Sequence, residues 1–301
     1  MIKNLKIALN IAIFLVVTGF IWHVARSVNK EEITYVENRP EMPFVSPYKA
    51  VSSFELPQEI NRFELYNGML FIVSGESVYI YDTMGNKLSS FPVKQTVRDI
   101  SIEEGNIYIL YPTLIEVYTF EGELSHEWEA CSELSDYCSL ALAGDFVFVT
   151  DAENKNICKY TKEGNFVKFI KSPRNFIIPT YSFDIESLND TIYCVNSGRH
   201  LVETYSLDGE FIAAFGGPGG EAGFFAGCCN PAYISFTPNG ELITSEKGNP
   251  RVSIYGRNGT FKEMILNSRL LGGGNKAYET RTDGNLLFVA GKNKISIFTE
   301  V

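Results

Sequence analysis

Tyr160-Thr-Lys-Glu-Gly164 is one of five segments in which a tyrosine is followed four residues later by a glycine. The others are Tyr81-Asp-Thr-Met-Gly85, Tyr118-Thr-Phe-Glu-Gly122, Tyr205-Ser-Leu-Asp-Gly209 and Tyr255-Gly-Arg-Asn-Gly259, and a sixth copy, Ile295-Ser-Ile-Phe298, reaches the aromatic residue. The successive aromatic residues are 37, 42, 45, 50 and 43 positions apart. Self-similarity at this period is typical of stacked supersecondary units.

Each repeat has the composition of several short strands. A small polar turn such as Tyr66-Asn-Gly68 precedes an apolar run such as Met69-Leu-Phe-Ile-Val73, and the strand that ends in the tyrosine follows. Asn-Gly and Asp-Gly between apolar runs are strong hairpin signals. Four antiparallel strands repeated six times predict an all-β protein, a six-bladed β-propeller. A β-sandwich is the alternative, but sandwiches lack a repeating motif.

The sixth repeat contains only three of the four expected strands. Val51-Ser-Ser-Phe54 precedes the first repeat and has the same pattern as Leu88-Ser-Ser-Phe91, the last strand of that repeat. We therefore expect this N-terminal strand to complete the last blade, which removes an open sheet edge. The propeller is predicted to cover residues 49–301 and to be monomeric.

The first thirty residues are of a different kind. Residues 7–25 carry no formal charge, and as a helix they would span about 28 Å, close to the thickness of the hydrocarbon core. Because Lys3 and Lys6 precede them, residues 1–6 are predicted to stay in the cytoplasm. We expect a single transmembrane signal anchor at 7–25, a tether at 26–48, and a propeller on the periplasmic or extracellular side of the cell membrane. A cleaved signal peptide is the alternative.

The charge of the propeller excludes one class of partner. Lys3, Lys6 and Arg26 are the only charged residues up to position 26, so the remainder carries −13 against −10 for the whole chain. Nucleic-acid phosphates require a basic surface, and no nucleic-acid partner is therefore expected.

The fifth repeat resembles the NHL repeat. Its matching positions are Phe215, Gly216, Gly223, Pro231, Gly240, Arg251, Val252, Tyr255 and Gly259. The resemblance implies a propeller across the region after the tether. It implies little about chemistry, because NHL propellers include RNA-binding domains, sensor domains of membrane kinases and a zinc lyase.

Cys228 and Cys229 depart from the NHL pattern and lie just before its proline. Adjacent α-carbons are about 3.8 Å apart, so a disulfide between neighbouring residues is strained, and strained disulfides are often labile or regulatory. Three interpretations stay open: two independent structural thiols, a redox pair with a labile disulfide, or a ligand pair for a soft metal such as copper(I). No cofactor is required.

Propeller topology predicts one face that carries both the blade-to-blade connectors and the loops between second and third strands. The candidate binding residues on it are Cys228, Cys229, Asn230, Glu246, Lys247, Arg251, Arg199 and His200. All six cysteines are expected near this face. Their even number suits an exported compartment, with Cys131–Cys138 and Cys158–Cys194 as candidate disulfides.

No catalytic residue is predicted. Beyond the N-terminal segment only His126 and His200 remain, too few for a three-histidine zinc site, and no Cys-x-x-Cys motif is present. The leading hypothesis is a membrane-anchored binding scaffold for a protein, peptide or envelope ligand. A redox or metal-handling protein that uses Cys228 and Cys229 is the alternative, and a lyase or hydrolase is less favoured.

Overall fold

The computed structural model describes residues 14–20, 44–94 and 96–301. Residues 46–301 form one compact unit, and the residues up to 45 belong to another. Residues 14–20 are helical, and no helix among the described residues is long and apolar enough to cross a membrane. The rest of the predicted anchor (7–13 and 21–25), the predicted cytoplasmic residues 1–6 and the tether up to residue 43 lie outside the described residues.

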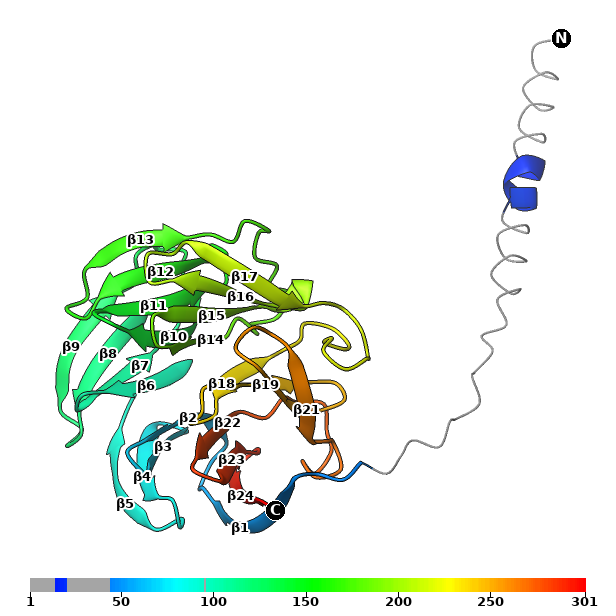
Figure 1. The fold of residues 1–301 in the computed structure, drawn as a ribbon. Coiled ribbons are helices and arrows are strands. Elements are labelled where there is room, and N and C mark those ends of the chain that lie inside the picture. The colour runs from blue at the N-terminus through cyan, green and yellow to red at the C-terminus, as the bar shows by residue number, and fades with distance from the viewer. Residues whose placement is uncertain (1–13, 21–43, 95) are drawn as a thin grey trace. The chain divides into compact units, whose positions relative to one another are not determined.

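The compact unit consists of six four-stranded antiparallel sheets arranged around a central axis (Figure 1). Blades one to three contain β2 (Ile60–Tyr66), β3 (Met69–Ser74), β4 (Ser77–Asp82) and β5 (Lys87–Pro92); β6 (Asp99–Glu103), β7 (Asn106–Leu110), β8 (Leu114–Thr119) and β9 (Leu124–Glu129); and β10 (Tyr137–Ala143), β11 (Phe146–Asp151), β12 (Asn156–Thr161) and β13 (Phe166–Ile170). Blades four and five contain β14 (Ile185–Leu188), β15 (Thr191–Asn196), the 3-10 helix η1 (Ser197–Arg199), β16 (Leu201–Ser206) and β17 (Phe211–Gly216); and β18 (Tyr233–Phe236), β19 (Leu242–Glu246), β20 (Arg251–Tyr255) and β21 (Phe261–Leu266).

Blade six is assembled from both ends of the propeller sequence. Its strands are β22 (Thr280–Asp283), β23 (Leu286–Ala290), β24 (Lys294–Glu300) and β1 (Tyr48–Glu55), in that order across the sheet. Antiparallel pairing places Phe54 opposite Ile295 and Ser52 opposite Ile297. The strand that the sequence predicts for closing the ring therefore occupies the outer edge of the last blade, and the prediction of a six-bladed propeller is confirmed.

The repeated tyrosine and glycine have the same positions in blades one to five, and Phe298 takes the place of the tyrosine in blade six. The five tyrosines and Phe298 are all at least 92% buried at the end of a third strand. The strand register shifts by one residue at each tyrosine, and the turn glycine four residues later has a φ between 79° and 87°. A left-handed residue followed by a bulge is a common way to close a short hairpin, which explains the fixed spacing.

Each turn glycine also lies against the preceding blade. A Cβ added there would lie 2.1–2.7 Å from a bulky side chain on the previous outer strand. The five side chains, in blade order, are Phe54, Phe91, Trp128, Ile170 and Phe215. The glycine is therefore required by close approach as well as by its backbone angle.

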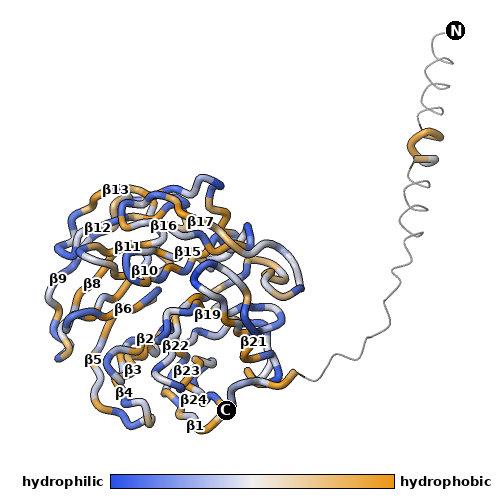
Figure 2. The backbone as a smooth tube through the Cα atoms, viewed as in Figure 1, coloured by the Kyte–Doolittle hydropathy of each residue, from blue (hydrophilic) through white to orange (hydrophobic). Residues whose placement is uncertain are grey.

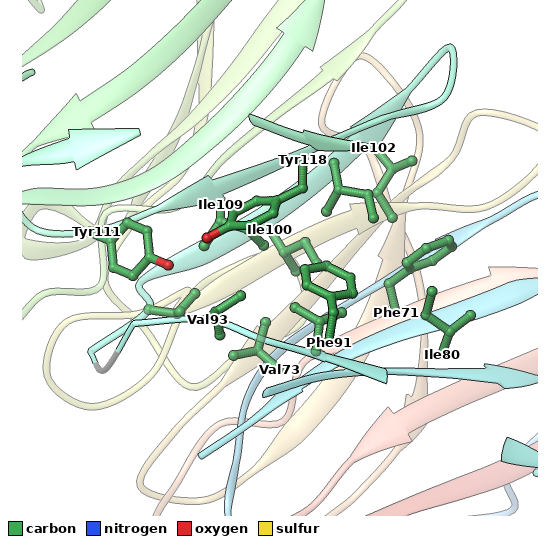
Figure 3. Packing of buried hydrophobic residues seen from close by; sticks show 13 residues of the cluster. Phe71, Val73, Ile80, Phe91, Val93, Ile100, Ile102, Ile109, Tyr111 and Tyr118 are labelled. Carbon is green, nitrogen blue, oxygen red and sulfur yellow. The ribbon is translucent and has the colours of Figure 1, made fainter. Parts of the chain in front are cut away.

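The apolar core is divided into wedges between neighbouring blades. Figure 3 shows the wedge between blades one and two, where Phe71 and Phe91 lie on one side and Ile109 and Tyr118 on the other. Apolar residues recur in short stretches along the strands, and the turns between them are mostly hydrophilic (Figure 2). This alternation matches sheets that are buried against their neighbours on both faces.

The blade-to-blade connectors and the loops between second and third strands share one face, here called the connector face. In blade three, Ala152 N in such a loop donates to Asp136 O in a connector at 2.9 Å. In blade five, Gly248 N donates to Asn275 O in the next connector, also at 2.9 Å. The topological expectation from the sequence is thus confirmed.

The interblade glycine contact can be tested with a matched pair of substitutions. Gly164 and Gly105 have φ of 87° and 86°, but a Cβ at Gly164 would lie 2.4 Å from the Trp128 indole, whereas nothing lies within 4 Å at Gly105. We expect Gly105→Ala to cost about 1 kcal/mol of unfolding free energy, and Gly164→Ala ~1–3 kcal/mol more, in chemical denaturation. Equal losses would show that the contact with the preceding blade has no energetic role.

Candidate functional site

A buried charged cluster occupies the central channel, where the first strands of the blades meet. Arg62 on β2 is 92% buried, and its guanidinium faces carboxylates from three other blades. Nε lies 3.7 Å from Asp99, and Nη1 lies 3.7 Å from both Asp184 and Glu279. These acids belong to blades two, four and six, so Arg62 links alternate blades across the axis.

Each of the three carboxylates also accepts a backbone N–H from the next blade. The donors are Leu140 to Asp99 at 2.9 Å, Ile234 to Asp184 at 2.8 Å and Phe63 to Glu279 at 3.1 Å. Ser139 Oγ donates to this network as well, between Asp99 and Asp184. A buried carboxylate with several donors is held in one geometry, and the cluster is therefore rigid.

A second arginine lies next to the first. Arg281 on β22 is 3.0 Å from Glu64 on β2, 3.1 Å from Glu186 on β14 and 3.3 Å from Glu279. The cluster thus has five carboxyl groups around two guanidinium groups. If every acid were ionised, the channel would carry excess negative charge in a medium that solvates it poorly.

The ionisation of the cluster reflects this excess. Burial raises the pKa of Glu279 from 4.5 to about 7 and that of Asp184 from 3.8 to about 6, although Arg281 and Arg62 act in the opposite direction. Burial also raises the pKa of Glu64 and of Glu186. The channel therefore retains protons up to near-neutral pH.

Three adjoining cavities form the mouth of the channel on the connector face. The largest, about 430 Å³, is called the Lys292 cavity; it extends to Glu59, Lys276 and Glu279. The Lys247 cavity has about 350 Å³ and the Arg98 cavity about 200 Å³. Tyr233 lines all three, and Arg62 lines the two smaller ones. The cluster thus forms the floor of a recess that a small ligand could enter.

The two smaller cavities are lined by cations without acids. Arg62, Lys247 and Lys276 line the first, and Arg62 and Arg98 line the second. Lys247 Nζ donates to the hydroxyls of Thr180 at 2.7 Å and Ser182 at 3.1 Å rather than to a carboxylate.

Both arginines of the Arg98 cavity have an unused donor. Arg62 Nη1 and Arg98 Nε are buried and have no hydrogen-bond partner among the described residues. The guanidinium groups also stack on tyrosine rings, Arg62 on Tyr233 at 4.6 Å and Arg98 on Tyr181 at 4.7 Å. Buried donors without acceptors are costly, by about 1–3 kcal/mol each, so they indicate a place for a water molecule or a ligand.

The predicted binding residues of blade five do come together, but most of them hold the connector. Asn230 and Lys247 exchange two hydrogen bonds of 2.9 Å through the Asn230 side chain and the Lys247 backbone. Glu246 is 99% buried, pairs with Arg251 and accepts the Ala226 N–H at 2.9 Å. Of these residues, Lys247 lines a mouth cavity.

Arg199 and His200 lie at η1 and also support loops. Arg199 Nε donates to Asn175 O at 2.9 Å, and His200 O accepts the Gly217 N–H at 2.7 Å. Neither residue lines the mouth cavities, nor does His126, which lies on β9.

The contacts between cysteine sulfurs differ from the predicted pairs. Cys131 Sγ lies 3.1 Å from Cys158 Sγ, so Cys158 rather than Cys138 is its neighbour. Cys138 lines the Arg98 cavity, and Cys194 is fully buried in the wedge that also contains Cys138. Spacing along the chain does not determine which thiols meet across a propeller.

Cys228 is exposed and Cys229 is 99% buried, and their sulfurs are 2.8 Å apart. Burial and the neighbouring thiol raise the pKa of Cys229, so it is not an activated thiolate. Within residues 14–20, 44–94 and 96–301, no group of three or more histidines, cysteines and acids could hold a metal ion. A metal at this pair would therefore have the two sulfurs as its protein ligands.

The channel cluster was not predicted from the sequence. A signal for it exists, because Arg62, Asp99, Asp184 and Tyr233 each stand directly before an apolar residue at the start of a first strand. Aligning the first strands of the repeats would have placed them at one level of the channel. They include three residue types, one basic, one acidic and one aromatic, and so the position does not stand out as a motif.

Comparison with known proteins identifies the fold but no family. No family model and no curated protein sequence matches the chain. Virginiamycin B lyase from Staphylococcus aureus is similar in structure, with a TM-score of 0.60, 15% identity, and coverage of 84% of this chain and 100% of the lyase. A streptogramin B lyase has a TM-score of 0.57, 13% identity and coverage of 84% and 97%. A structural genomics protein of unknown function from Bacteroides thetaiotaomicron has a TM-score of 0.55 and 13% identity, and the match covers 84% of this chain and 72% of that protein.

At these identities the likeness supports the propeller fold alone. The NHL resemblance of the fifth repeat has no matching family model and stays a prediction.

The raised pKa of Glu279 predicts a pH-dependent stability. Between pH 4.5 and about 7 the folded chain keeps a proton that the unfolded chain has released, so stability falls as pH rises through this range. We expect the Tm of the native chain to fall on the order of 5 °C from pH 5 to pH 8. Glu279→Gln should reduce this fall in Tm but not abolish it, because burial also raises the pKa values of Asp184, Glu64 and Glu186.

The control for this experiment is Glu241→Gln. Glu241 pairs with Lys262 at a solvent-exposed position, so its replacement should leave the pH slope unchanged. A Glu279→Gln slope equal to that of the native chain would show that Glu279 does not hold the proton.

Proposed function

We propose that this propeller is a binding module whose ligand occupies the mouth of the central channel on the connector face. The observation that carries the proposal is the set of three adjoining cavities around Tyr233, with a rigid charged floor and unused arginine donors. Binding sites are typically concave, largely preformed and equipped with a few convergent polar groups. The proposed site differs from the sequence hypothesis in its centre, which is the channel mouth rather than the cysteine pair.

The lining favours binding over catalysis. Glu279, whose pKa is raised to about 7, lines the Lys292 cavity, but it already accepts a backbone N–H and faces both channel arginines. A catalytically inactive form of the staphylococcal lyase has been solved with quinupristin, so a protein of this fold can accommodate a small molecule. A lyase or hydrolase activity for this chain has no comparable support.

We also propose that the module is held at the outer side of a cell membrane. The support is the uncharged run at residues 7–25 with Lys3 and Lys6 before it. A small-molecule or peptide ligand of the cell envelope would then have direct access to the propeller.

A second candidate function uses Cys228 and Cys229 as a redox pair. The sulfur separation of 2.8 Å and the exposure of Cys228 favour it. Formation of the disulfide would release two protons and two electrons, which an oxidised dithiol protein of the exported compartment would accept by thiol–disulfide exchange. The exposed Cys228 sulfur is the accessible point of attack.

Blocking the mouth tests the leading proposal. Ala277 lines both the Lys292 and Lys247 cavities, so Ala277→Trp should fill their junction. In a ligand-observed NMR screen of small polar fragments, we expect the fragments that bind the native chain to bind this variant with at least tenfold lower affinity.

Asp145→Trp is the matched control, because Asp145 is an exposed residue in the turn between β10 and β11, on the opposite face. Fragments that still bind the Ala277→Trp variant but no longer bind the Asp145→Trp variant would show that the binding site lies away from the channel mouth.

The redox candidate predicts a selective change in mass. After treatment of the folded chain with oxidised glutathione, the peptide with Cys228 and Cys229 should lose two hydrogens and resist alkylation. The peptide with Cys194, which is fully buried, should be unchanged. Continued alkylation of both Cys228 and Cys229 after this treatment would rule the redox role out.

A further inference from the structure

We infer that the channel mouth recognises an organic monocarboxylate, whose carboxylate lies in the Arg98 cavity between Arg62 and Arg98. This inference rests on the proposed function, because it names the chemical class of ligand for the same site. It depends on three features of the mouth: the sign of the charge, the unused donors and the rings beside them.

The sign of the charge is unusual for this protein. The chain carries a net charge of −10, yet the Arg98 and Lys247 cavities are lined by Arg62, Arg98, Lys247 and Lys276 and by no acid. Asp136 pairs with Arg98 at 3.2 Å without lining either cavity. An anion in these cavities is attracted by the four cations that line them; Arg98 and Lys276 also pair with Asp136 and Glu59, which line neither cavity.

The unused donors fit a carboxylate. Arg62 Nη1 and Arg98 Nε are buried and have no hydrogen-bond partner among the described residues, although Arg62 Nη1 lies 3.7 Å from Asp184 and Glu279. The two arginines are fixed to each other because Arg62 Nε donates to Arg98 O at 2.7 Å. Guanidinium N–H groups and carboxylate oxygens form strong, charge-assisted hydrogen bonds. Two arginines that line one cavity and are joined by a hydrogen bond therefore offer their guanidinium groups to one carboxylate.

The channel floor limits the charge of the ligand. Asp99, Asp184 and Glu279 lie within 3.7 Å of Arg62 and already balance much of its charge. A dianion such as phosphate would be repelled more strongly than a monoanion.

The flanking rings favour an organic body on that monoanion. Tyr181 and Tyr233 line the same cavity, and each stacks with one of the arginines. A flat or apolar group attached to the carboxylate can pack on their faces.

Two fluorinated probes test the inference by ¹⁹F NMR on the full chain. We expect 4-fluorobenzoate to bind at least ten times more tightly than its neutral counterpart 4-fluorobenzamide, and more tightly than inorganic phosphate used as a competitor. Arg98→Gln should weaken the binding of 4-fluorobenzoate at least tenfold and leave the binding of the amide unchanged.

Arg174→Gln is the control, because Arg174 stacks on Phe211 at 5.0 Å as Arg98 stacks on Tyr181, but lines none of the mouth cavities. If Arg98→Gln fails to fold, Tyr181→Ala provides a second variant, since Tyr181 is 58% exposed, and it should weaken 4-fluorobenzoate at least threefold.

The outcomes separate this inference from the proposed function. Equal binding of the acid and the amide, both lost in Ala277→Trp, would overturn the carboxylate assignment and leave the mouth as a binding site. Tighter binding of phosphate, or loss of 4-fluorobenzoate in Arg174→Gln, would also overturn it. Binding of neither probe, with fragment hits unaffected by Ala277→Trp, would contradict both.

Discussion

The charged contact between Arg62 and three carboxylates is the constraint on which the centre of the propeller depends. Asp99, Asp184 and Glu279 each reach Arg62 from a different blade, and each also accepts a backbone N–H from the blade that follows. Loss of Arg62 would leave these buried carboxylates without the guanidinium that they share, at a cost of about 3–5 kcal/mol. The alternate blades are thereby fixed relative to one another at the axis, while apolar wedges fix neighbouring blades further out.

The same cluster explains why the mouth has a preformed shape and an uneven charge. Acids from the first strands concentrate in the channel, where the backbone donors of adjacent blades stabilise them. Arg98, Lys247 and Lys276, which line the mouth, come from the connectors and loops above, and Lys247 donates to hydroxyls rather than to a carboxylate. Negative charge below and positive charge above create a field along the axis, and a bound group would be oriented by it.

The sequence was sufficient for the fold and for only part of the site. The tyrosine-to-glycine spacing repeats because each third strand ends at the same bulged turn against the preceding blade, so it predicts six blades and their register. Topology then places Asn230 and Lys247 side by side, as predicted. Arg62 and Asp184 were missed because they come from different repeats and differ in chemistry, and only the ring brings them together. The contact of Cys131 with Cys158 depends on an interatomic distance that strand spacing does not determine.

The long connector of the fifth repeat connects the fold to the proposed site. It folds back on itself through hydrogen bonds from Phe225 N to Gly217 O and from Gly219 N to Phe225 O, and it buries the Phe225 ring completely. Most of its extra length is thus used for packing, which is why Glu246 and Arg251 serve the connector rather than a ligand. Its far end holds Asn230 against Lys247, whose ammonium lies at the channel mouth. The connector that carries Cys228 and Cys229 therefore also holds Lys247 through Asn230, and the two candidate functions share one structural element.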